Sequence, residues 1–417
     1  MNRPCKPQCH GQTPNRIASW QFRAKTRSAL PIEQECCLVM RTAPATIARV
    51  FGRGAQRIWI RRLTVELLPI VVALVLAVVP ISASWIEFWY STTAYPRIQR
   101  TLTPFSNLVP FAILDLLLLI VVPTVVFRLV AAGRESWRVR GIRPLGRTVF
   151  HLLTTTAALY IAFLMLWGFN YRRVRMEDRL VLDRPAPNSQ QVVELGLKAV
   201  SEMNRLYSTA HEQLVVGSEW RDAALRNAFA DVQRTLAAAP QAEPGRLKRS
   251  MLGPYFRWAG VDGMVNPFGL EVIANPDLLA FERPFVAAHE WSHLAGYADE
   301  AEANFVGWLT CIRASPSHQY SAWFFLYWQI AGEVNAEERG RLNMALADGP
   351  RRDVNAVITR LRRGQIPALQ RASWQVYDKY LKANRVEAGV RSYGEVVTLV
   401  LRARFAPEWV PVRRGEE

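Results

Sequence analysis

Three long apolar runs restrict the possible folds of this chain more than any other feature. They comprise residues 67–85, 108–130 and 149–169. Each run is close to the ~20 residues that a helix needs to cross the hydrocarbon core of a bilayer. Because lipid offers no partners for backbone N–H and C=O groups, a membrane-crossing run of this kind must be helical. The sequence therefore predicts three transmembrane helices.

Two ionisable residues lie within these runs. Asp115 falls in the second run and His151 in the third. Ionisable groups inside a membrane are functional candidates, but a single one more commonly forms a hydrogen bond between helices. We therefore assign no chemistry to either residue.

The net charge of +17 lies entirely in the apolar part of the chain. Residues 1–175 contain 23 Lys and Arg but only 6 Asp and Glu, whereas residues 176–417 contain 29 of each kind. Basic clusters beside apolar runs are typical of membrane proteins, while a nucleic-acid-binding domain carries its positive charge on its folded surface. The charge pattern therefore indicates a lipid bilayer as partner and argues against nucleic acid.

The charges of the loops predict how the chain is oriented. The N-terminal segment is rich in arginine, the loop 131–147 contains five arginines, and the loop 91–107 contains two. The positive-inside rule places the first two of these segments in the cytoplasm. With three crossings, the C-terminal domain then lies on the outer side, although three arginines directly after the third run argue the other way.

The rest of the chain predicts a mainly α fold with a short β edge element. The expected parts are a basic, disordered segment 1–62, a membrane domain 63–173, a linker 174–191, a helical domain 192–408 and a tail 409–417. Apolar residues recur at helical spacing in 192–207, 220–237 and 370–381. Gly, Pro and Asn punctuate residues 260–275, which indicates a hairpin or edge strand. The cysteines offer no disulfide framework, because four of the five lie in the first 40 residues.

The segment His289-Glu-Trp-Ser-His293 is the sharpest chemical signal. Pro284 suits a first helical turn and Gly296 suits a C-terminal cap, so we expect a helix of about three turns between them. On this helix the two histidines are four residues apart and share one face, where both can bind one zinc ion. Glu290 can then act as general base on a zinc-activated water, whose pKa falls to roughly 7.

The pattern His-Glu-x-x-His also occurs by chance in ordinary amphipathic helices without a metal. Here the neighbours of the histidines are uncharged, and both helix ends carry the expected signals, which favours the metal site. A protease site within the membrane is disfavoured, because Glu282 and Arg283 precede the helix and Asp299 and Glu300 follow it. The apolar run between these charges is too short to cross a bilayer.

A third metal ligand is expected among the acids that follow the motif. Asp299 and Glu302 stand three apart at a helix start, where they suit the structural role of a capping box. Glu300 has no such role, and it lies on a stripe of small and polar residues that permits close approach to the motif helix. We expect Glu300 as the third ligand, with Glu302 next and Asp299 third. Asn304, one turn after Glu300, is expected to bond a ligand histidine.

Three residues are available to stabilise an oxyanion near the metal. They are Tyr320, His318 and Tyr393. None is distinguished by its spacing, and each also suits a packing or capping role. Glu271 is expected on the edge strand that would hold an extended peptide.

These motifs resemble those of the zincin metallopeptidases. The run Glu300, Ala303, Asn304 looks like the Glu-x-x-Ala-Asp helix of membrane gluzincins related to the heat-shock and CAAX-prenyl proteases, with Asn304 in place of Asp and a shorter gap after His293. The chain is closer to an uncharacterised bacterial family of three-span membrane proteins with a HExxH domain. The matching segments are 170–173, 266–271, 289–293, 302–305, 377–384 and 389–393. This resemblance implies a zincin-like zinc peptidase domain and a multi-pass location in the bacterial cytoplasmic membrane.

The expected function is that of a membrane-anchored, zinc-dependent metallohydrolase, in particular a peptidase that acts on polypeptide near the membrane surface. The alternative is a catalytically inactive zinc-binding sensor or assembly protein. The two differ at Glu290, because its exchange for Gln abolishes hydrolysis in the first case and leaves the cellular phenotype intact in the second.

Overall fold

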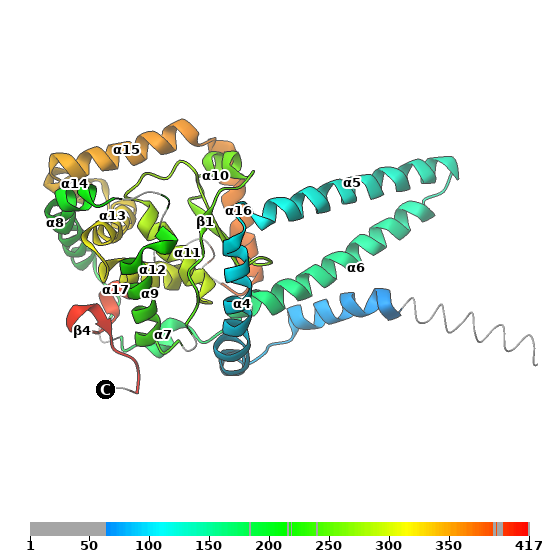
Figure 1. Cartoon of the computed structure of the whole chain (residues 1–417), viewed down its shortest axis with the longest axis horizontal. Coiled ribbons are helices and arrows are strands. Elements are labelled where there is room, and N and C mark those ends of the chain that lie inside the picture. Colours follow the sequence, from blue (N-terminus) through cyan, green and yellow to red (C-terminus); the bar gives the residue numbers. More distant parts are fainter. Residues whose placement is uncertain are drawn as a thin grey trace, which may run out of the picture. The chain divides into compact units, whose positions relative to one another are not determined.

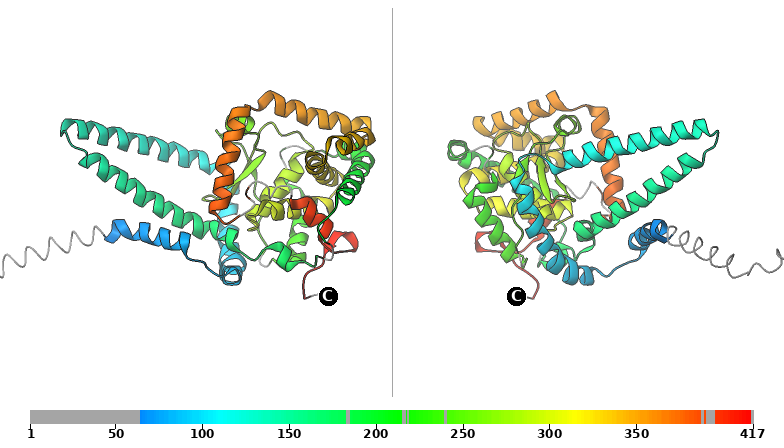
Figure 2. Two further views of the ribbon diagram at one scale, coloured as in Figure 1. Left: turned by 180° about the vertical axis from the view of Figure 1, so that it is seen from behind. Right: turned by 45° about the vertical axis from the view of Figure 1, so that its right-hand side comes forward.

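Two long apolar helices run side by side as a hairpin in the computed structural model (Figures 1 and 2). They are α5 (Ile113–Arg138) and α6 (Arg143–Leu166), and each is long and apolar enough to cross a membrane. Most of their large apolar side chains are exposed, as expected of helices that pack against lipid. The structure describes residues 64–182, 185–214, 217, 219–238, 241–386, 389 and 395–415. The second and third predicted spans are thus confirmed as helices of membrane-crossing length.

The first apolar run is not one straight helix. A helix over Thr64–Val78 is followed by a break and then by α3 (Ala83–Ile86), the π-helix η1 (Glu87–Ala94) and α4 (Tyr95–Leu108). The two arms are bent by 118° at the break. Pro80 lies in the break, and a proline both removes an N–H donor and disfavours helix at the residue before it. The chain therefore has two helices suited to crossing, or three if the bent pair counts as one span.

The remainder of the chain is mainly helical, as predicted. The α-helices are α7 (Met176–Arg179), α8 (Ser189–Glu212), α9 (Ala223–Thr235), α10 (Gly253–Ala259), α11 (Arg283–Leu294), α12 (Glu300–Ile312), α13 (Pro316–Glu333), α14 (Ala336–Ala345), α15 (Asp348–Gly364), α16 (Pro367–Ala383) and α17 (Glu395–Arg402). Short 3-10 turns are η2 (Gly168–Arg172), η3 (Glu219–Arg221) and η5 (Pro407–Trp409). The helical patterns predicted over 192–207, 220–237 and 370–381 correspond to α8, α9 and α16.

Helices α11, α12 and α13 form the centre of the core. Every residue of α12 is buried, and Trp291 and Trp308 are among the largest fully buried side chains. Gly307 permits the close packing of α12 on α11, because a Cβ atom there would lie 2.9 Å from the backbone nitrogen of His289. The small residue at this position therefore determines how near the two helices can come.

A three-stranded sheet lies beside α11. Its strands are β1 (Leu247–Lys248), β2 (Gly263–Asn266) and β3 (Glu271–Ala274), in the order β1-β3-β2. Strands β2 and β3 are antiparallel, with Met264 opposite Ile273, so the predicted hairpin is confirmed. The two-residue strand β1, parallel to β3, was not predicted. A second small sheet pairs β4 (Phe405–Ala406) with β5 (Val410–Pro411).

Glu271 lies on the central strand, so its expected place on the edge strand is wrong. Its side chain is fully buried and forms an ion pair of 2.7 Å with the buried Lys248. Its two oxygens also accept the backbone N–H groups of Ile113 and Leu114, at 2.9 and 2.8 Å. A carboxylate satisfies these groups well, because the first N–H groups of a helix have no partner within it and carry partial positive charge. Glu271 thus anchors the start of α5 on the sheet.

The two ionisable residues of the apolar runs have structural partners. Asp115, near the start of α5, accepts hydrogen bonds from the Ser250 hydroxyl at 2.5 Å and from the Met251 N–H at 2.9 Å. A hydrogen bond to another membrane helix had been expected. The partners of Asp115 lie instead in the loop before α10. His151 lies 3.7 Å from Glu66, on the helix before the break.

The predicted linker and tail both contribute to the folded unit of residues 65–417. Met176 and Leu180 are buried in the main core, and Leu180 forms a β-bridge with Arg413. The N-terminal segment 1–62, with its four cysteines, lies outside the described residues.

Candidate metal centre

Helix α11 carries both histidines of the motif, within the bounds predicted from the sequence. Pro284 lies in its first turn, and Gly296 follows its end with a φ of 86°, a conformation that favours glycine. The side chains of His289 and His293 are 12% and 10% exposed, so both are largely withdrawn from water.

The end of α11 is held by residues of α4 and of the segment directly after α6. The carbonyl of His293 accepts a hydrogen bond from the Trp167 indole at 3.0 Å, and the carbonyl of Leu294 accepts one from the Tyr95 hydroxyl at 2.8 Å. Arg173 donates to the carbonyl of Gly296 at 3.0 Å. The last carbonyls of a helix need external donors, and here the chain around α4 and after α6 supplies them.

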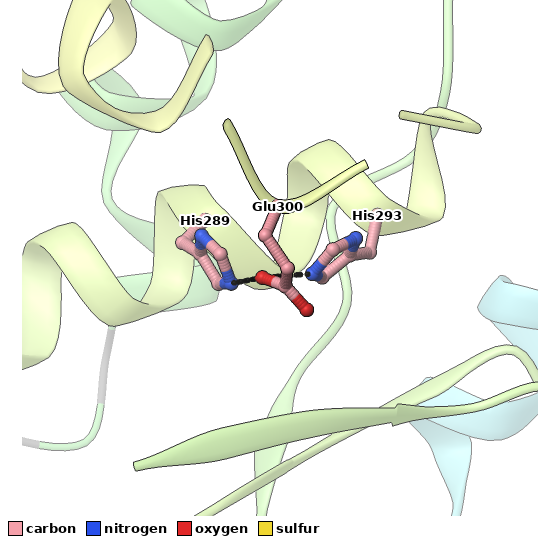
Figure 3. Close-up of side chains that lie close together, drawn as sticks. All are labelled: His289, His293 and Glu300. Atoms are coloured by element: carbon pink, nitrogen blue, oxygen red, sulfur yellow. Dashed lines mark ion pairs between the residues drawn. The ribbon is translucent and has the colours of Figure 1, made fainter. Parts of the chain in front are cut away.

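Helix α12 brings Glu300 to the two histidines. Its oxygen Oε2 lies 3.5 Å from Nε2 of His289 and 3.5 Å from Nε2 of His293, and Figure 3 shows the carboxylate between the two rings. One ligand atom from each of the three residues lies within 4.8 Å of the others. A separation of 3.5 Å is longer than a good hydrogen bond, and it is near the ~3.3 Å between two ligands of a tetrahedral zinc ion with bonds of ~2.05 Å.

The other two acids of this segment have different partners. Asp299 caps α12 by accepting the N–H groups of Ala301 at 2.9 Å and Glu302 at 3.3 Å. The carboxylate of Glu302 accepts the N–H of Met176 at 2.6 Å, so it does not complete the expected capping box. Burial raises the pKa of Glu302 to about 7, and the charge of Asp299 adds to this effect. Glu300 is therefore the acid that the fold brings to the histidines.

Glu290 lies next to His289 on α11 and against the edge strand β2. It is 2% exposed, and a Cβ atom at Gly263 would lie 2.4 Å from its Oε1, so only glycine leaves room for this carboxylate. Burial raises the pKa of Glu290 to about 8, and the charge of Glu300 adds to the rise. Its second oxygen, Oε2, is buried without a hydrogen-bond partner.

The three candidate ligands shift one another's pKa values. Burial and the charge of His293 lower the pKa of His289 to about 4. Burial also lowers the pKa of His293, but the charge of Glu300 outweighs it and raises this pKa to about 9. Burial raises the pKa of Glu300, whereas the two histidines outweigh that effect and lower it to about 2. The group therefore holds a proton on His293 at neutral pH that a cation would have to displace.

A second layer of groups orients the candidate ligands. Nδ1 of His293 lies 2.8 Å from the carbonyl of Tyr297, an acceptor that requires a proton on Nδ1 and leaves Nε2 to face Glu300. Tyr377 of α16 donates its hydroxyl to Oε1 of Glu300. The side chain of Asn304 raises the pKa of His289, but Nδ2 of Asn304 and Nδ1 of His289 are both buried without a hydrogen-bond partner, so the expected hydrogen bond to a ligand histidine is not formed.

Two of the three residues expected to stabilise an oxyanion form hydrogen bonds with residues outside the metal centre. Tyr320 is fully buried and donates its hydroxyl to Asp353 at 2.5 Å, and Nδ1 of His318 lies 2.6 Å from the Ser315 hydroxyl. Tyr393 lies outside the described residues. Sequence reasoning missed Tyr377 as a site residue, although the segment 377–384 had been singled out as a motif.

Comparison with known proteins identifies a family. The model of the family described as "Protein of unknown function (DUF3810)" matches residues 90–401, which is most of the chain. No curated protein and no solved structure matches it.

Proposed function

The chain belongs to the DUF3810 family, and we propose that it is a membrane-anchored zinc-dependent hydrolase, in particular a peptidase, with His289, His293 and Glu300 as metal ligands. The observation that carries this proposal is the position of one Glu300 oxygen at 3.5 Å from both imidazoles. Two helix faces thus supply the histidines and the carboxylate that a catalytic zinc site requires.

The hydrogen bonding of the group fits a cation. Oε2 of Glu300, Oε2 of Glu290 and Nδ1 of His289 are buried without hydrogen-bond partners. A buried polar group without a partner costs about 1–3 kcal/mol, and more if it is charged. A cation between the imidazoles would relieve this cost at Glu300 directly. Nδ1 of His289 faces away from this position, so the two unpartnered carboxylate oxygens are the atoms that a ligand explains better than packing alone.

The chemistry assigns different roles to the carboxylates. A bound zinc ion would supply a water of lowered pKa and polarise a substrate carbonyl. The charge of a bound ion would lower the raised pKa of Glu290 and favour its ionised form. Glu290 would then accept the proton of the attacking water, since its oxygen Oε2 is free of hydrogen bonds, and would return it to the leaving group. Glu300 would hold the ion, with its other oxygen fixed by Tyr377.

The sheet supports a polypeptide as substrate. Strand β2 pairs only with β3 in the described part of the chain, and its residue Gly263 touches Glu290. An extended peptide can pair with an open strand edge through its main chain, which would align a peptide bond with the carboxylate. We therefore favour a peptide over a small ester or amide.

The hairpin supports an orientation in the membrane. Both of its ends contact the body, through Ile113 at the start of α5 and Trp167 after α6, so the connection of the two helices lies on the opposite side. The loop 131–147 around that connection contains five arginines. The positive-inside rule then places the connection in the cytoplasm and the metal centre outside, whether or not the first bent pair crosses.

The test is hydrolysis by the purified full-length protein in lipid nanodiscs. With labelled casein as substrate, we expect a zinc-dependent rate that Glu290→Gln abolishes while zinc content stays unchanged. Equal rates in both proteins would overturn the hydrolase proposal.

An inactive zinc-binding protein is the second candidate, and the low exposure of the ligands favours it. In that case the wild type binds zinc and hydrolyses nothing, and Glu290→Gln leaves the cellular phenotype intact.

A further inference from the structure

Helix α16 extends between the attachment points of the two membrane helices (Figure 2). Near its start, the N–H of Ile366 bonds the carbonyl of Trp258 on α10 at 3.0 Å, and the Tyr255 hydroxyl bonds the hydroxyl of Ser373 at 3.2 Å. The loop just before α10 contains Met251, whose N–H bonds the residue Asp115 at the start of α5. This half of α16 is therefore joined to the base of α5 through α10.

The other half of α16 lies against the end of α6. The ring centroid of Tyr380 is 6.4 Å from that of Phe163 on α6 and 6.0 Å from that of Tyr171, just after α6. If α5 and α6 cross a bilayer, both attachment points lie at the same surface of that bilayer, because they are the two ends of one hairpin. A helix that joins these points would then run along that surface, near the layer of the lipid headgroups.

The exposed side chains of α16 and α10 suit this layer. Leu381 is the one buried residue among the 17 of α16. Exposed apolar side chains of the two helices and the loop before α10 are Met251, Tyr255, Trp258, Ile366, Trp374, Val376 and Tyr380. Exposed basic side chains of α16 are Arg371, Lys379 and Lys382, of which Lys382 forms an ion pair with Asp378. Aromatic residues beside apolar and basic ones are typical of segments at a membrane interface.

We propose that α10 and α16 form an interfacial surface that binds the lipid bilayer, with Val376 among the acyl chains and Arg371 and Lys379 at anionic headgroups. Its continuity with the α5–α6 hairpin identifies the bilayer as the occupant. The proposal depends on the crossing of that hairpin and not on any hydrolytic activity.

The position of Tyr377 gives this surface a consequence for the metal centre. The same helix donates the Tyr377 hydroxyl to Glu300, so the candidate ligands are covered by a helix that lies in the membrane interface. The metal centre would then lie directly beside the lipid surface, within reach of a polypeptide that is bound to the membrane.

Quenching by brominated lipid tests the proposal. The four N-terminal cysteines of the full-length chain are replaced by serine; Cys311 can stay, because it is buried and burial raises the pKa of its thiol. A bimane label is attached to Val376→Cys, to Phe127→Cys on α5, or to Met344→Cys on α14. Met344 is the matched control, since it is 76% exposed, against 68% for Val376, and α14 packs on α8.

Each outcome is decisive in vesicles of phosphatidylglycerol and brominated phosphatidylcholine. We expect a label at position 376 to lose about half of its fluorescence, as suits a depth of ~5–10 Å, and the label at 127 to lose at least as much. The label at 344 should keep its fluorescence. Equal signals at 376 and 344 would overturn the interfacial surface, and an unquenched label at 127 would remove the hairpin on which it depends.

Discussion

The contact of α11 with α12 at Gly307 permits a sharp test of the ligand set. In Gly307→Ala, the new Cβ atom would lie 2.9 Å from the backbone nitrogen of His289 and 3.0 Å from its Cα. Ordinary van der Waals contact between such atoms starts near 3.4 Å. Because both partners are helix backbone, no side chain can move aside, and the two helices must separate by roughly 0.5 Å.

That separation acts directly on the candidate metal site, because α11 holds both histidines and α12 holds Glu300. Metal–ligand distances tolerate deviations of only about 0.2 Å. We therefore expect zinc affinity to fall about 10–100-fold, which is the usual effect of displacing a group that supports a ligand. Overpacking should also lower the free energy of unfolding by about 1–3 kcal/mol.

The assay is competition for zinc with a chromophoric chelator, together with thermal unfolding of the metal-free protein. Gly340→Ala is the matched control, because Gly340 lies within α14 and a Cβ atom there meets nothing within 4 Å. It should leave zinc affinity unchanged and stabilise its helix by about 0.5–1 kcal/mol. A folded Gly307→Ala protein with the zinc affinity of the wild type would refute a site shared between α11 and α12.

Three further predictions concern the surroundings of the site. Tyr377→Phe should weaken zinc binding about tenfold with little change in melting temperature, because it removes the hydrogen bond to one Glu300 oxygen. Chelator competition and calorimetry measure the two quantities. Unchanged zinc affinity with a lower melting temperature would mean that the tyrosine only packs. Zinc affinity should rise about tenfold per pH unit from 7 towards 9, because below its pKa of about 9 His293 must lose a proton when zinc binds. Titration calorimetry at several pH values measures this dependence. A zinc affinity that does not change with pH would argue against His293 as ligand. Glu271→Ala should destabilise the fold by about 3–5 kcal/mol, because it leaves the Lys248 charge buried and unpaired; an unchanged denaturation midpoint would contradict the proposed anchoring of α5.

Local patterns were sufficient to predict the motif helix α11 and the acid of α12, Glu300, that lies beside its histidines. Pro284 and Gly296 mark the ends of α11, and the four-residue spacing of the histidines fixes a shared face whatever the rest of the fold. Glu300 could be chosen over Glu302 because a helical wheel already separates their faces. These features depend on residues close together in the sequence.

Features that depend on distant segments were not predicted. Tyr377 reaches Glu300 from 77 positions along the chain, and the hydroxyl of Tyr320 is used by Asp353, 33 positions away. Glu271 was placed on an edge strand because the two-residue strand β1 is too short to be recognised from its sequence. The break at Pro80 was overlooked, since hydropathy averages over a window and does not register a single missing donor.

The most direct test of the metal centre is the zinc content of the purified full-length protein. We expect one zinc ion per chain in the wild type and none in His289→Ala. His211→Ala should retain its zinc, because His211 pairs with Asp353 and lies outside the three-residue group. Equal zinc in the wild type and His289→Ala would contradict the proposed centre.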